Sequence, residues 1–100
     1  MKTTISEEND KMIAVLEGEL DTAAAVQTEK DFQLLMDSKG KNIVLDCTGL
    51  QYISSSGLRL FLSLLKRTKA NGGTLTIENI GDNIKKVFSM TGFSALFDIR

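Results

Sequence analysis

Three short apolar segments constrain the fold of this chain more than any other feature of the sequence. They cover residues 12–16 (MIAVL), 42–47 (NIVLDC) and 74–79 (TLTIEN). The first two are almost continuously apolar, as in strands buried on both faces, and the third alternates between apolar and polar residues. Stretches with helical periodicity separate them. The sequence therefore predicts strands that alternate with helices.

The first helical stretch begins at Thr22. Its apolar face contains Ala25, Phe32, Leu35 and Met36. Asp21 or Thr22 is the predicted N-cap, because either side-chain oxygen can accept a hydrogen bond from a free amide of the first turn. Residues 38–41 (SKGK) are expected to end the helix, with Gly40 in the left-handed conformation.

The second helix, over residues 57–70, has the clearest pattern. Its apolar side chains recur with i, i+3, i+4 and i+7 spacing: Leu58, Phe61, Leu62 and Leu65. A third, short amphipathic helix follows the strand at 74–79. Asp82 or Asn83 is its predicted cap, and Gly92 is expected to end it.

Weaker strands are predicted near the two ends of the sequence, over residues 2–6 and 95–99. The order of elements is then β-β-α-β-α-β-α-β, which favours a sheet with helices packed on it and parallel pairs at the crossovers. A length of 100 residues fits one ordinary domain. We therefore expect a single α/β domain over residues 1–100.

Composition narrows the classes of function. A chain of this size can bury one core but has little area left for a deep cleft, so a surface site is favoured over a large catalytic pocket. The chain has no histidine, which excludes a Ser-His-Asp triad and most zinc and iron sites. We expect neither enzymatic activity nor a bound metal or cofactor.

Charge and cysteine content point to an intracellular protein that does not bind nucleic acid. The net charge is -1, which gives no general attraction to nucleic acid or to an anionic membrane. The single cysteine, Cys47, cannot form an intrachain disulfide and is expected to be a small buried apolar side chain. The polar first residues and the lack of an apolar run of about 18 residues favour the cytoplasm and no membrane span.

Three consecutive serines, Ser54, Ser55 and Ser56, lie between a buried strand and the clearest helix, just before Gly57. In one interpretation Ser55 or Ser56 is the N-cap of that helix and the other serines occupy a turn. In another, Ser55 is a phosphorylation site. A phosphate there adds about -1.5 to -2 charges beside a helix N-terminus that tolerates anions, with Arg59 about one turn further on. A serine nucleophile is disfavoured, because no histidine base exists.

Three segments together resemble one known family, the STAS domain of the bacterial anti-sigma factor antagonists. They are LEGELD at 16–21, NIVLDCTGLQYISSSGLRLF at 42–61, and the stretch from GGTLTIEN to ALFDI at 72–99. Their order and spacing cover nearly the whole chain. The resemblance implies a mixed sheet of four or five strands with helices mainly on one side.

The resemblance also implies a function. Members of this family bind an anti-sigma factor that is a serine kinase, and binding frees a sigma factor. The kinase phosphorylates a serine of the antagonist and thereby releases it, and a PP2C-type phosphatase reverses the modification. The phosphorylated residue corresponds to Ser55, with Ser54 and Ser56 as less favoured acceptors. The implied contact residues are Asp21, Ser54, Ser55, Ser56, Gly57, Leu58 and Arg59. The free protein is expected to be a monomer.

One departure from the family pattern leaves an alternative open. The family usually has an acidic residue before the acceptor serine, where this chain has Ser54. The alternative is a STAS binding module outside sigma control, in a lipid-transport or sensory complex, with no phosphorylation switch.

Other side chains have two interpretations each. Asp46 is either a buried carboxylate near the serines or, as we favour, a partly exposed acid bonded to a backbone amide. Met90 and Phe93 are expected to pack in the core, or to form a contact surface if exposed. Leu58 is expected in the core, and it would be a contact residue if exposed.

Overall fold

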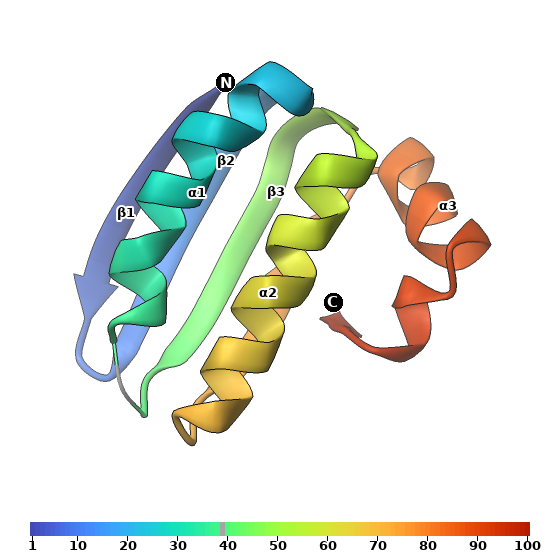
Figure 1. Ribbon diagram of the computed structural model, residues 1–100. Coiled ribbons are helices and arrows are strands. Elements are labelled where there is room, and N and C mark those ends of the chain that lie inside the picture. The colour runs from blue at the N-terminus through green and yellow to red at the C-terminus, as the bar shows by residue number, and fades with distance from the viewer. Residues whose placement is uncertain (39) are drawn as a thin grey trace.

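Five strands form one mixed sheet in the computed structural model, which describes residues 1–38 and 40–100 (Figure 1). The strands are β1 (Lys2–Glu8), β2 (Lys11–Leu20), β3 (Asn42–Ile53), β4 (Thr74–Glu78) and β5 (Asp98–Ile99). The helices are α1 (Thr22–Met36), α2 (Ser55–Ala70) and α3 (Asp82–Met90), with the short 3₁₀ helix η1 (Phe93–Ala95) after α3. The predicted single α/β domain with a mixed sheet is confirmed.

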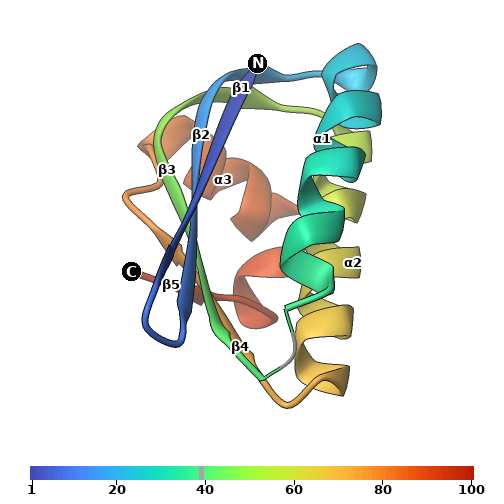
Figure 2. The same ribbon diagram turned by 90° about the vertical axis from the view of Figure 1, so that its left-hand side faces the viewer.

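The spatial order of the strands follows their order in the sequence, β1-β2-β3-β4-β5. β1 and β2 form an antiparallel hairpin, and all later neighbours pair in parallel. Each parallel crossover moves one position in the same direction. Because such crossovers are right-handed, they place their helices on the same face of the sheet. Figure 2 shows α1 and α2 on this one side of the sheet, and Figure 1 shows them side by side.

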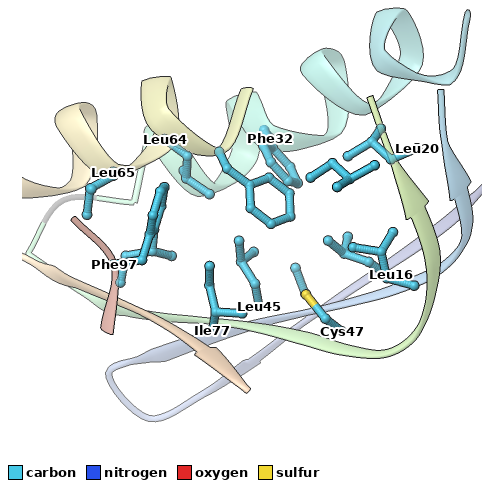
Figure 3. Close-up of a cluster of buried hydrophobic side chains, with 14 of the residues drawn as sticks. Leu16, Leu20, Phe32, Leu45, Cys47, Leu64, Leu65, Ile77 and Phe97 are labelled. Atoms are coloured by element: carbon cyan, nitrogen blue, oxygen red, sulfur yellow. The ribbon is translucent and has the colours of Figure 1, made fainter. Parts of the chain in front are cut away.

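The core lies between the sheet and these helices (Figure 3). Side chains from alternate strand positions meet the buried faces of α1 and α2, as the period of two in a strand requires. The fully buried aromatic rings of Phe32, Phe61 and Phe88 come from α1, α2 and α3. Ring centroids are 6.0 Å apart both for Phe32 and Phe61 and for Phe61 and Phe88. Phe61 therefore joins all three helices.

Both long parallel strands extend further than the sequence predicted. β2 runs to Leu20, beyond the predicted segment 12–16, and β3 runs to Ile53, beyond the predicted segment 42–47. The pairing of β2 with β3 continues across register shifts near Val15 and Gly18, which has a φ of 106°. Glycine tolerates that backbone conformation, so the strand bends there instead of stopping.

The first helix ends at Met36, and Gly40 has the predicted left-handed φ of 72°. Lys39, within the stretch expected to end this helix, lies outside the described residues. Cys47 is fully buried, as expected, and burial raises the pKa of its thiol to about 12. Over residues 1–38 and 40–100, no helix has the length and hydropathy needed to cross a membrane.

Candidate functional site

The carboxyl ends of β2 and β3 bring Asp21 and the serines together. Leu20 and Ile53 are paired residues at the end of the parallel register. The amide of Ser54 donates a hydrogen bond to the carbonyl oxygen of Leu20 at 2.9 Å. This bond holds the connection between β3 and α2 against the connection between β2 and α1. α1 and α2 therefore begin side by side at one end of the sheet (Figure 1). Sites in open α/β sheets are commonly built at this end.

Asp21 is the N-cap of α1, as predicted. Its Oδ1 accepts a hydrogen bond from the amide of Ala24 at 2.8 Å, and its backbone is extended. The residue is exposed, so a second carboxylate oxygen remains available to a partner. Asp21 thus combines a structural role with a negative charge on the surface.

Ser54 is the N-cap of α2, so the prediction of Ser55 or Ser56 as cap is wrong. The Oγ of Ser54 accepts a hydrogen bond from the amide of Gly57 at 3.2 Å. The physical reason is the length of β3: the strand continues to Ile53, and the helix begins at Ser55, two residues earlier than predicted. Ser54 is also only 8% exposed, which removes its hydroxyl from the surface.

Ser55 and Ser56 occupy the first turn of α2. Ser55 is exposed and Ser56 is half-buried. The first turn contains no acidic residue, and amides at this position lack an intrahelical acceptor. The positive end of the helix dipole is therefore not offset by a carboxylate of its own helix. Arg59, one turn further, is exposed and forms no ion pair with any described residue.

Gly57 and Leu58, by contrast, are buried. Leu58 is 6% exposed and packs in the core, as expected. Gly57 allows the start of α2 to approach the ends of β2 and β3 closely. Gly57 therefore helps to position the neighbouring serines.

Replacing Gly57 by alanine should destabilise the protein, although alanine is the better helix former. The added Cβ would lie 2.7 Å from Cγ of Leu20 and 2.9 Å from Cγ1 of Ile53. Overpacking of this kind costs about 1–3 kcal/mol, against a helix-propensity gain of at most about 1 kcal/mol. Chemical denaturation should show a net loss. Ser63→Ala, on the exposed face of the same helix, should show none, and a Gly57→Ala protein as stable as wild type would contradict the packing described here.

The start of α3 lies near the same end of the sheet. Its N-cap is Gly81, not Asp82 or Asn83, and Asp82 lies in the first turn, where its charge favours the helix dipole. The side chain of Asn83 instead donates a hydrogen bond to the carbonyl oxygen of Gln51 at 3.2 Å and ties α3 to the end of β3. Sequence reasoning also missed Tyr52, which is 48% exposed only two residues before Ser54. The signal available in the sequence was an aromatic residue only two positions before the three serines.

The remaining side chains lie apart from the serines or take unexpected positions. Asp46 is the partly exposed acid that we favoured: it accepts hydrogen bonds from the hydroxyl and the amide of Thr48 at 2.6 and 3.1 Å. The Thr48 hydroxyl chiefly holds the pKa of Asp46 below its usual range. Phe93 packs partly against the core, whereas Met90 is 86% exposed, contrary to the expectation of core packing.

Comparison with known proteins gives a consistent result. The profile of the STAS domain matches residues 2–100. A candidate anti-sigma factor antagonist, BtrV of Bordetella bronchiseptica, is 32% identical over 99% of this chain and 85% of its own length. The anti-sigma-B factor antagonist of Bacillus subtilis is 31% identical, over 92% of this chain and 83% of its own.

Solved structures agree on the fold. The anti-sigma factor antagonist SpoIIAA in its unphosphorylated form superimposes with a TM-score of 0.76 at 20% identity, over 99% of this chain and 87% of its own. The phosphorylated form of SpoIIAA from Bacillus superimposes with a TM-score of 0.75 at 21% sequence identity. The match covers 99% of this chain and 91% of that one.

Fold and site thus define a small α/β protein whose helix N-termini present a polar surface at one end of a mixed sheet. The chain belongs to the STAS domain family and, within it, to the anti-sigma factor antagonists. Proteins of this class are regulators and not enzymes.

Proposed function

We propose that this protein acts in the cytoplasm by binding an anti-sigma factor with serine kinase activity, which frees a sigma factor. Phosphorylation of Ser55 by that kinase switches the binding off, and a PP2C-type phosphatase restores it. The observation that carries this proposal is the position of Ser55: an exposed hydroxyl in the first turn of α2, beside the exposed carboxylate of Asp21 at the start of α1.

The three serines differ in their suitability as acceptors. Ser54 is buried, and its oxygen is the helix cap, so a phosphate there would require the start of α2 to unfold. Ser56 is half-buried between the two helices. Ser55 is exposed, and its side chain forms no hydrogen bond with any described residue. A kinase can reach Ser55 without disturbing the fold.

A phosphate on Ser55 would change the surface without unfolding the protein. It adds about -1.5 to -2 charges at the positive end of α2, where anions are favourable. A partner that docks closely against the start of α2 would meet both the bulk and the charge of this group. Binding is therefore lost while stability is kept. The solved phosphorylated form of SpoIIAA is a precedent for phosphorylation in a folded relative.

The neutral cap at Ser54 favours a second candidate, the STAS module without a switch. Where the family usually has an acid, the surface lacks a negative charge next to the acceptor, and a kinase that recognises the acid would phosphorylate this chain poorly. In that case Ser55 has no regulatory role and the partner lies outside sigma control.

Replacing Asp21 by asparagine should separate its two roles. Asparagine caps helices about as well as aspartate, so thermal stability should stay close to that of wild type. The lost charge should weaken binding to the kinase-type anti-sigma factor about tenfold or more, if the carboxylate is paired across the interface. Calorimetric titration with the purified kinase from the source organism measures this.

Asp10→Asn is the matched control, because it removes the same charge in the exposed turn between β1 and β2, at the opposite end of β2 from Asp21. It should leave the affinity unchanged. Equal affinity of wild type and Asp21→Asn would exclude Asp21 from the contact surface.

A further inference from the structure

Charge is distributed unevenly along this chain. Residues 1–38 contain three basic and nine acidic residues, whereas residues 54–100 contain seven basic and three acidic ones. Because the strands are ordered in space as in the sequence, this difference separates two sides of the molecule. β1, β2 and α1 form an acidic side, and α2 and α3 form a basic side (Figure 1). The net charge of -1 conceals this polarity.

The border between the two sides is hollowed along α1 and α2. One hollow of about 260 Å³ lies near the serines, and its lining includes Val26, Ser56, Arg59 and Leu60. A second hollow of about 420 Å³ lies further along, lined by Met36 of α1 and by Ser63, Lys66, Arg67 and Ala70 of α2. We call these two hollows the α1–α2 groove.

The groove combines apolar side chains with a basic wall. Val26 is 63% exposed, although it is β-branched and apolar. α2 contributes Arg59, Lys66 and Arg67 and has no acidic residue anywhere along its length. An acid, Glu29, lines only the hollow near the serines. Among the residues that the structure describes, none that lines the second hollow is an acid that could offset Lys66 and Arg67.

We propose that the α1–α2 groove binds an acidic segment of the protein partner, with the acidic side chains of that segment at Lys66 and Arg67. The identity of the partner rests on the proposed function: it is the kinase-type anti-sigma factor. The groove begins beside Ser56 and Arg59, so one partner can contact the serine end and the groove together. Charge complementarity then orients the partner before it reaches Ser55.

A protein segment fits the groove better than nucleic acid does. Apolar side chains in the groove offer contacts to aliphatic or aromatic anchors of a partner, which a phosphate backbone lacks.

The test compares Lys66→Glu with Lys69→Glu. Both side chains are exposed and lie three residues apart on α2, but Lys69 lines a different hollow, near Leu96. We expect Lys66→Glu to slow association with the purified kinase about tenfold at low salt and Lys69→Glu to change it less than about twofold. High salt should reduce the difference between them. Equal rates for the two variants, whether slow or fast, would overturn the proposal.

A single introduced thiol gives a second measurement. The native Cys47 is fully buried, so it does not compete for alkylating reagents in the folded protein. Ser63→Cys places a thiol in the groove, and Ser6→Cys places one on the distant strand β1. The kinase should protect the first from alkylation and not the second. An unprotected thiol at position 63 in the bound complex would overturn the proposal.

These outcomes separate the groove from the proposed function itself. Suppose that Asp21→Asn and Ser55→Asp weaken binding, while Lys66→Glu associates as fast as Lys69→Glu and the thiol at position 63 is alkylated as readily as the thiol at position 6. The proposed function is then supported, and the groove is excluded as a binding site. If the wild-type protein does not bind the kinase at all, both proposals are excluded.

Discussion

Ser55→Asp should weaken binding to the kinase-type anti-sigma factor on the order of 100-fold, because an uncompensated charge placed in an interface costs several kcal/mol. The same change should leave thermal stability unchanged or slightly higher. An acid in the first turn of a helix is favourable by about 0.3–1 kcal/mol, and the first turn of α2 has none at present. Calorimetric titration and thermal unfolding of one preparation measure both effects.

Two controls make this result specific. Ser55→Asn has a similar shape but no charge, so it should retain most of the affinity. Ser6→Asp adds the same charge on exposed β1, away from the serines, and should have no effect. If Ser55→Asp bound the kinase as wild type does, the serine would not be a switch, and the constitutive binding module would be the better account.

Phe61→Ala should be among the most destabilising single substitutions in this chain. The ring is fully buried and contacts Phe32 of α1 and Phe88 of α3, so its removal leaves a cavity where three helices meet. Replacement of a buried phenylalanine by alanine costs about 3–5 kcal/mol, a large part of the roughly 5–15 kcal/mol that stabilises an ordinary domain. Denaturant titration measures the loss.

Met90→Ala is the control for Phe61→Ala. It also removes a large apolar side chain, but that side chain is 86% exposed, so the change should cost less than about 0.5 kcal/mol. A loss below about 1 kcal/mol for Phe61→Ala would contradict the central position of this ring.

Local patterns in the sequence were enough to predict the helix faces and the alternation of elements. Ala25, Phe32 and Leu35 are all buried, as their spacing requires, because helical periodicity is a property of neighbouring residues. Met90 was wrongly expected in the core, although the same periodicity places it on the exposed face of α3. It is out of phase with Ile84 and Phe88, the two buried residues of α3.

The ends of β2 and β3 were not predictable from such patterns. Thr48 and Gly49 have the composition of a turn, yet they lie within β3, because β2 supplies the hydrogen bonds on one side. Gly49 is where the strands approach closely: an added Cβ would lie 2.9 Å from Cγ of Glu17. This pairing is a tertiary interaction, and the error at the strand end moved the predicted cap from Ser54 to its neighbours.

At the site, the sequence pattern put Asp21 correctly at the start of α1, but it placed the serines before the second helix, whereas Ser55 and Ser56 lie in its first turn. The family resemblance favoured Ser55 over Ser54 and Ser56 as the acceptor. Burial adds a physical reason for that order, since Ser54 lies under the start of α2 and Ser55 lies on the surface. The α1–α2 groove could not be predicted from the sequence either, because it is formed by side chains from two helices that are distant along the chain.

The most direct test of the proposed switch is a peptide map by mass spectrometry of the protein purified from its own cells in several growth states, with and without phosphatase treatment. The account predicts one phosphoryl group, localised to Ser55, in a fraction of the molecules that changes with growth state and disappears on phosphatase treatment. A chain that is unmodified in every state, or modified only at Ser54, would contradict it.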